Sequence, residues 1–206
     1  FNDTHKTEFD AHLAEKATEE DLGHVIVDGD TITIDENGVI SGSGAETSNR
    51  TITVGTDKDF TTIQAAIDGI KKRVDADITI NVDAGTYAED VLIAGFSGKG
   101  TITLNGGANN TEAVNYIVNK IGIVQCSCYV EIKGFTASTT TAVPYEGAFY
   151  ARSCISVRFL YCITTANANI TGFYFRYSMG QVNGCIASNK EVALYSTSCS
   201  IVSSKG

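Results

Sequence analysis

The chain has 206 residues, of which 43% are apolar, enough for one domain with a buried core and a short appendage. Its formal net charge of −9 is uneven: residues 1–50 carry 12 acidic and 3 basic side chains, whereas residues 51–206 carry 12 of each. This distribution argues against a nucleic-acid partner, which requires a basic face, and the absence of a long apolar run argues against a membrane span.

The first expected element is a helix over residues 3–21. Phe9, Leu13 and Ala17 recur every four residues along it, which gives a narrow apolar stripe. Such a stripe is too thin to stabilise a lone helix, so we expect it to pack around the symmetry axis of an oligomer.

A β-hairpin is expected next. Residues 31–34 alternate Thr and Ile, and the step Asn37-Gly38 is a common hairpin turn. Residues 42–49 are rich in Gly, Ser, Asn and Thr and indicate a flexible joint. We therefore assign residues 1–50 to an N-terminal helix, hairpin and linker that attaches the chain to its neighbours.

From residue 51 the pattern changes to one short helix followed by many short strands. The helix is expected at about residues 60–72, where one face carries Phe60, Ile63, Ala66, Ile67 and Ile70. Strand alternation begins with Ile78, Ile80 and Val82. A mainly β chain of this kind predicts a right-handed parallel β-helix over residues 51–206, with the helix capping its open N-terminal end.

The amino-acid sequence of this segment also resembles that of a known family. Over residues 51–107, "DFTTIQAAID" followed by "VDAGTYAEDVLI" resembles the start of the pectinesterase and pectate-lyase-like β-helix superfamily, in the version found in bacteriophage tail spikes, tail fibres and neck appendages. "ATEEDLGHV" and "ENGVIS" in the first 50 residues resemble the trimerising collar of phage tail fibres. The resemblance implies a homotrimer of the virion tail, assembled in the bacterial cytoplasm beside other tail proteins.

All six cysteines lie between Cys126 and Cys199, without the spacing of a disulfide framework. We expect them to be reduced, buried, small apolar residues. A short motif of Ser followed by a sulfur-containing residue repeats along the same region: Ser127-Cys128, Ser153-Cys154, Ser178-Met179 and Ser198-Cys199. This repeat predicts a ladder of sulfur side chains on one inner face of the stacked coils.

Histidine and carboxylate positions give little support to catalysis. His5, His12 and His24 all precede the β-helix, so a Ser-His-Asp site within it is not expected. His5 and His12 share a heptad position and could bind a metal on a threefold axis, but solvated helix histidines are the simpler interpretation, and we expect no metal and no cofactor.

A glycosidase requires two suitably spaced carboxylates. No spacing singles out a pair among the acids of the coils, which are Asp83, Glu89, Asp90, Glu131, Glu146 and Glu191. The aspartate and arginine pattern of pectinesterases cannot be placed after residue 107 either. The sequence therefore leans away from an enzyme.

Aromatic and arginine residues gather between residues 145 and 177. In the run 173–177, Phe173, Phe175 and Tyr177 share one face, expected to be core, and Tyr174 and Arg176 share the other. A Tyr beside an Arg can stack on a sugar and hydrogen-bond to it, although a contact between subunits would use the same residues. The candidate ligand-binding residues are Tyr174, Arg176, Tyr150, Arg152, Arg158 and Glu146.

These observations lead to one expected function and two alternatives. We expect a phage tail-fibre or receptor-binding fragment that binds a bacterial surface polysaccharide or teichoic acid along a trimeric β-helix. A polysaccharide depolymerase of the tail-spike type, either hydrolase or lyase, and a purely structural fibre segment are the alternatives.

Overall fold

The computed structural model divides into two compact units, one ending at Gly44 and one beginning at Ala45. The residues that it describes are 32–34, 40–42, 44–139, 147–165, 170–188, 193–197 and 201–205. In the first unit, β1 (Ile32–Ile34) pairs antiparallel with β2 (Ile40–Gly42), which confirms the predicted hairpin. The helix expected over residues 3–21 lies outside the described residues.

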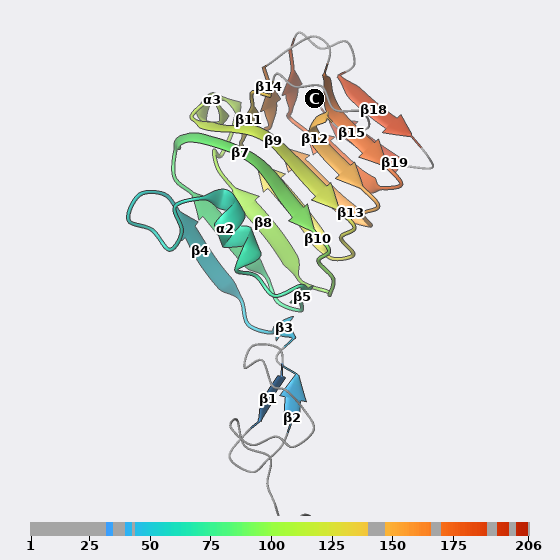
Figure 1. The fold of residues 1–206 in the computed structure, drawn as a ribbon. Coiled ribbons are helices and arrows are strands. Elements are labelled where there is room, and N and C mark those ends of the chain that lie inside the picture. Colours follow the sequence, from blue (N-terminus) through green and yellow to red (C-terminus); the bar gives the residue numbers. More distant parts are fainter. Residues whose placement is uncertain are drawn as a thin grey trace, which may run out of the picture. The chain divides into compact units, whose positions relative to one another are not determined.

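The second unit is a stack of parallel strands, which lie side by side in Figure 1. One sheet has seven strands, each pairing in parallel with the strand of the next coil. In stacking order they are β4 (Arg50–Val54), β6 (Ile78–Val82), β8 (Thr101–Asn105), β10 (Tyr129–Lys133), β13 (Ser156–Leu160), β16 (Met179–Asn183) and β19 (Ile201–Lys205).

The other sides of each coil belong to an eight-stranded sheet. Its long strands, β7 (Gly85–Ala94) and β9 (Tyr116–Val124), pair along their length, and β9 then pairs with two shorter series. One series is β11 (Thr136–Ala137), β14 (Ile163–Thr164) and β17 (Ile186–Ala187). The other is β12 (Gly147–Arg152), β15 (Thr171–Arg176) and β18 (Leu194–Thr197). This arrangement confirms the predicted parallel β-helix.

Small elements complete the unit. The two-residue strands β3 (Ala45–Glu46) and β5 (Arg73–Val74) pair in parallel, so the second unit begins before β4. A four-residue helix, α3 (Asn110–Ala113), precedes β9 and is capped by the Asn109 side chain.

The core is built from side chains that stack in register from coil to coil. Ile80, Leu104, Ile132 and Phe159 follow one another in the seven-stranded sheet and are fully buried. Opposite them, the rings of β12 and β15 stack, with Phe149 and Phe173 centroids 5.3 Å apart. Close stacking of this kind fills the interior to the density of a protein core.

Single residues in the left-handed conformation turn the chain at two bends that recur from coil to coil. The bends stack in register from coil to coil. A backbone N–H donates to the strand of the next coil at Gly95, Gln125, Ser153, Tyr177, Gly134 and Tyr161. At one bend the left-handed residues are Gly95, Gln125, Ser153 and Tyr177, and at the other Gly134, Tyr161 and Gly184. Only glycine adopts this conformation without steric cost, so the other residues hold it through the pairing on either side.

Cysteines follow these bends, three of them buried and Cys185 half-buried, but in stacks that differ from the predicted ladder. Cys126 and Cys154 follow the left-handed residue of the first bend, and Cys162 and Cys185 follow that of the second. Each Sγ lies within hydrogen-bonding distance of the carbonyl oxygen two residues earlier. Met179, which was expected in the ladder, is 49% exposed, because the bend places Ser178 in the inward position.

The predicted capping helix is present and shorter than expected. α2 (Ile63–Asp68) contacts β4 and β7 at the first coil (Figure 1), and it buries Ile63, Ala66 and Ile67. The Glu89 carboxylate accepts hydrogen bonds from the backbone N–H groups of Ile63 at 3.0 Å and Gln64 at 2.8 Å. α2 thus has its first N–H groups satisfied by a strand of the coil that it covers.

The side chain of Gln64 completes the contact between α2 and the sheet. Its amide oxygen accepts from Leu92 N at 2.8 Å, and its amide nitrogen donates to Leu92 O at 3.1 Å. Leu92 belongs to β7, the first strand of the eight-stranded sheet. Gln64 therefore occupies hydrogen-bonding positions that another strand would otherwise take, which protects an exposed sheet edge.

We predict that Glu89→Ala lowers the free energy of unfolding by about 1–2 kcal/mol, because two helix N–H groups lose a charged acceptor. Asp90→Ala is the matched control, since the Asp90 carboxylate is 60% exposed and forms an ion pair of 3.6 Å with Lys120. This control substitution should lower the free energy of unfolding by less than about 0.5 kcal/mol. Denaturant titrations of both variants test this, and equal losses would contradict the capping role.

We predict that Gly134→Ala is far more destabilising than Gly95→Ala, although both glycines have φ near +70°. A Cβ at Gly95 meets no atom within 4 Å, so only the backbone cost of about 1 kcal/mol applies. A Cβ at Gly134 would run into the carbonyl oxygen of Gly107 in the preceding coil, which adds a loss of about 3 kcal/mol or more. Thermal unfolding of both variants measures the difference.

Candidate functional site

The outer side of β12, β15 and β18 carries an aromatic column. Strand alternation directs Phe149 and Phe173 into the core and turns their neighbours Tyr150 and Tyr174 outward. Tyr150, Tyr174 and Tyr195 are in register on successive strands. We call these three residues the tyrosine column, and the outer side of the three strands the tyrosine face.

The inner members of this column are far less accessible than expected. Tyr150 and Tyr174 are only 6% and 5% exposed, whereas Tyr195 is 45% exposed. The rings of Tyr174 and Tyr195 stack with centroids 5.4 Å apart and planes 13° apart. Tyr150 and Tyr174 also form a small apolar cluster with Val124. From strand alternation, Tyr174 was expected to face solvent or a neighbouring subunit. It lies on the outer side but is not exposed there, because outward rings in register bury one another.

Space for the first ring of the column comes from a glycine. Gly122 is the residue of β9 in register with Tyr150, and a Cβ there would overlap the Tyr150 ring. Lys120, two residues before Gly122, has its Nζ 6.0 Å from the centroid of the same ring. The ring is thus held between the sheet and a cation.

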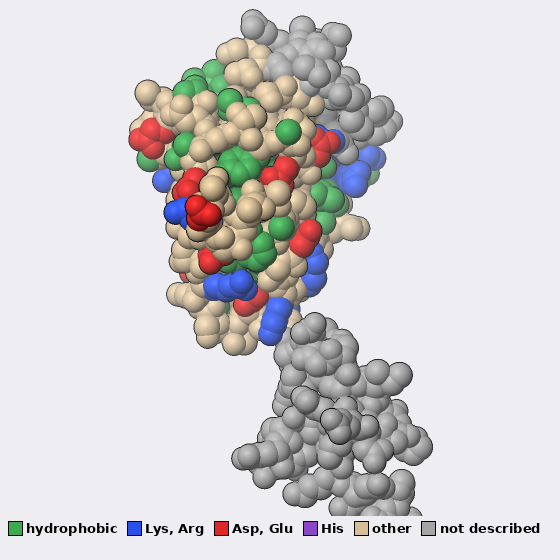
Figure 2. Space-filling view, turned by 60° about the vertical axis from the view of Figure 1, so that its left-hand side comes forward, with side chains coloured by type: hydrophobic (Ala, Val, Ile, Leu, Met, Phe, Trp, Pro, Cys, Tyr) green, Lys and Arg blue, Asp and Glu red, His purple; other side chains and the backbone are tan. Residues whose placement is uncertain are grey.

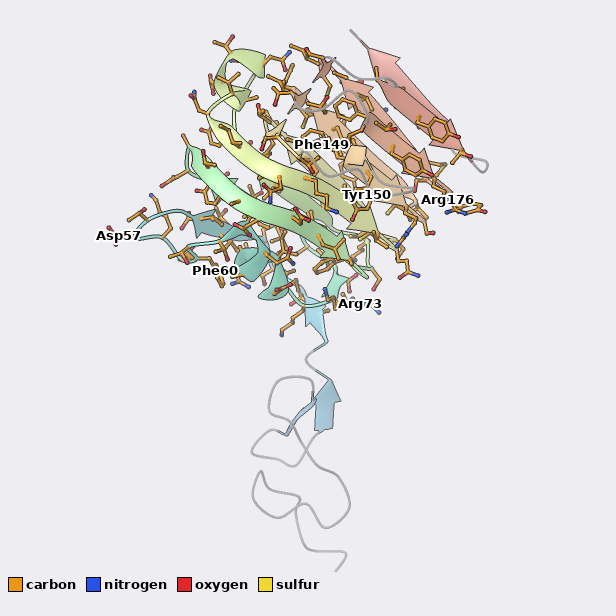
Figure 3. All side chains as sticks on the ribbon, turned by 45° about the horizontal axis from the view of Figure 1, so that its top comes forward. Asp57, Phe60, Arg73, Phe149, Tyr150 and Arg176 are labelled. Atoms are coloured by element: carbon orange, nitrogen blue, oxygen red, sulfur yellow. The ribbon has the colours of Figure 1, made fainter. Side chains whose placement is uncertain are left out.

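Two arginines lie in register beside the tyrosine column. Arg152 at the end of β12 is exposed and pairs in register with Arg176 at the end of β15. Figure 3 shows Tyr150 and Arg176 on the same side of the unit. Like charges on directly adjacent strands repel, so an anionic group placed between the two guanidinium groups would be favourable.

Tyr177 adds an exposed ring to this edge. It was expected on the inner face with Phe173 and Phe175, but its side chain is 57% exposed. The left-handed backbone at this position, with φ of 50°, ends the strand alternation. The guanidinium carbon of Arg176 lies 5.2 Å from the Tyr177 ring centroid, in a cation–π contact.

Arg158, another candidate residue, does not join this face. Arg158 lies on β13 of the seven-stranded sheet, forms an ion pair with Glu131, and lies 5.6 Å from the centroid of the Tyr129 ring. Desolvation by burial raises the pKa of Tyr129, although the neighbouring Arg158 guanidinium opposes the shift. Glu146, His5 and His12 lie outside the described residues.

Carboxylates near the coils are engaged in structural contacts. Besides Glu89 and Glu131, Asp83 lies 3.5 Å from Lys58, and Asp90 lies 3.6 Å from Lys120. Glu191 is outside the described residues. On the side shown in Figure 2, acidic and basic side chains are interspersed rather than gathered into one charged patch.

The described part of the chain contains no cluster of three or more His, Cys, Asp or Glu side chains arranged to hold a metal ion. Within the same residues, no helix has the length and apolar character needed to cross a membrane.

Sequence analysis did not single out Tyr195, which is the exposed end of the tyrosine column. The available signal was its place in the coil, because Tyr150, Tyr174 and Tyr195 occupy equivalent positions of β12, β15 and β18. Variable coil lengths hide that equivalence in the sequence.

Comparison with known proteins gives one structural similarity. The crystal structure of the pectin methylesterase from Aspergillus niger superposes with a TM-score of 0.49 at 13% sequence identity, covering 80% of this chain and 58% of that one. The aligned part thus spans little more than half of that enzyme. No protein-family model matches the chain, and no curated protein matches it.

We predict that Tyr174→Ala lowers the free energy of unfolding by about 2–3 kcal/mol, because it empties a buried position between two rings. Tyr195→Ala should lower the free energy of unfolding by less than about 1 kcal/mol, since Tyr195 is nearly half exposed. Denaturant titrations distinguish the two residues. Equal costs would contradict the assignment of Tyr174 to packing and Tyr195 to the accessible surface.

Proposed function

We propose that the protein is a β-helical segment of a phage tail fibre or other receptor-binding tail protein, and that its tyrosine face binds a bacterial surface glycan. The observation that carries the proposal is the in-register pair Arg152 and Arg176, flanked by the exposed rings of Tyr177 and Tyr195. A bacterial surface polysaccharide or a teichoic acid would fit this combination.

The chemistry of the face supports a glycan ligand. An aromatic ring offers a flat apolar surface to the C–H groups of a sugar, and its hydroxyl can hydrogen-bond to the sugar hydroxyls. Guanidinium groups bind phosphate or carboxylate oxygens in a bidentate manner. Because the arginines repeat from one coil to the next, at about 4.8 Å, they suit a polymer lying along the stack.

The assembly part of the proposal comes from the resemblance of residues 51–107 to phage tail proteins. On that basis the chain forms a homotrimer in the virion tail, joined to other tail proteins through residues 1–50. Three copies of a weak site would give useful avidity for a repetitive surface.

We predict that Arg152→Ala weakens binding to phosphate- or carboxylate-bearing bacterial glycans on a microbial glycan array by about tenfold, because a charged hydrogen-bond donor is lost. Arg73→Ala is the matched control: Arg73 is 65% exposed and lies on β5, where it pairs with Asp75 at 2.7 Å. Binding should also weaken as salt is raised.

Two outcomes would redirect the proposal. Shortening of a bound polysaccharide, seen by size-exclusion chromatography before and after incubation, would favour a depolymerase of the tail-spike type. Failure of the chain to bind any array glycan, with Arg152→Ala indistinguishable from the unaltered protein, would favour a purely structural fibre segment.

A further inference from the structure

A polar pocket lies at the start of the β-helix, away from the tyrosine face. It has a volume of about 440 Å³ and is formed by the loop 55–61 and the turn 83–87. Figure 3 shows Asp57 of this loop at the opposite side of the unit from Arg176. The volume is in the range of pockets that hold small ligands.

The loop wall of the pocket is held firmly in place. Phe60 forms an isolated bridge with Val54, and Gly55 N donates to Phe60 O at 2.9 Å. The Asp59 carboxylate accepts hydrogen bonds from both the backbone N and the Oγ1 of Thr53, each at 2.8 Å. These bonds, first of all the one from the Thr53 backbone, lower the pKa of Asp59, so the carboxylate stays ionised and keeps both bonds at neutral pH.

The turn forms the second wall and is fixed to the first. Asp83 N donates to Val54 O at 2.8 Å, and the Tyr87 hydroxyl donates to Asp83 O at 3.0 Å. A Cβ at Gly55 would lie 2.7 Å from Asp83 Oδ2, so the close approach of the two walls requires glycine there. The Tyr87 ring lies beside Gly85 at van der Waals distance. The pocket is therefore pre-formed, which reduces the entropic cost of binding.

The lining combines hydrogen-bond donors and acceptors with one aromatic ring. Asp57 and Asp83 supply carboxylates. Hydroxyl groups come from Thr56, Thr61 and Thr86. Asp57 has a φ of 59°, a conformation that is unfavourable for a residue with a side chain, and all these polar residues are exposed. Strained residues of this kind are found at binding sites more often than elsewhere.

The charge of the pocket selects the class of ligand. Lys58 Nζ lies 3.5 Å from Asp83 Oδ2, which leaves the Asp57 carboxylate as the excess charge. A phosphate or carboxylate ligand would be repelled, whereas hydroxyl groups can donate to the carboxylates and accept from the threonines and Lys58.

We propose that this pocket binds one neutral pyranose residue, with its hydroxyl groups toward Asp57 and Asp83 and its C–H face toward Tyr87. The inference rests on the proposed function, because it adds a neutral sugar subsite to a protein whose tyrosine face favours anionic groups. The glycan would then contain neutral sugars as well as charged ones.

The test is protein-observed ¹H–¹⁵N NMR of the full chain, titrated separately with the methyl glycosides of glucose, galactose and N-acetylglucosamine. At least one should shift the amides of residues 55–61 and 83–87 in a saturable manner. Asp83→Asn should weaken that binding about tenfold, and Thr86→Val about threefold, through lost hydrogen bonds. Asp90→Asn, which changes an exposed carboxylate further along β7 and outside the pocket, should leave it unchanged.

Absence of saturable shifts in these amides with all three sugars, up to about 100 mM, would overturn the inference. Equal weakening by Asp83→Asn and Asp90→Asn would overturn it as well. Thr86→Val guards against a folding defect, since valine has nearly the shape of threonine. Arg152→Ala separates the two proposals: it should weaken glycan-array binding about tenfold and leave the monosaccharide shifts intact. Monosaccharide binding without any array binding would reject the tyrosine face as a glycan-binding site and would leave the pocket proposal standing.

Discussion

In-register parallel pairing between successive coils is the constraint on which the rest of this structure depends. Each strand finds its partner one coil away, so an inward side chain always lies above another inward side chain and an outward one above another outward one. Phe149 therefore stacks on Phe173 within the core, and Tyr150 and Tyr174 occupy the same column outside it. A loss of register at one coil would misplace all the columns at once.

The bends preserve this register. At the recurring bends a single left-handed residue ends the strand, and the following residue points inward at Cys126, Cys154 and Ser178, where a thiol or hydroxyl satisfies the carbonyl two residues earlier. Cys126, Cys154 and Ser178 occupy this position at one bend, so cysteine serves here as a small packing residue with a weak donor. The stacked bends give coils of different length the same corner geometry.

A filled interior leaves the outer surface for recognition. Side chains repeat there at the spacing of the coils, which suits a polymeric ligand better than a compact one. The first coil differs, because α2 and the loop before it close the stack with bonds from Glu89 and Gln64 and form a pocket as they do so. The capping that protects the sheet edge thus also supplies concave, polar surface.

The sequence by itself determined the parallel β-helix class, the hairpin, the capping helix and the inward position of Phe173 and Phe175, because local periodicity encodes these features. Only the tertiary structure decided the burial of Tyr174, the exposure of Tyr177 and the separation of Arg158 from the tyrosine face. The physical reason is that coil register and the left-handed bends arise from pairing between residues far apart in the chain. Alternation within one strand shows which side chains point outward, but it cannot show which residue of the next coil will cover each of them.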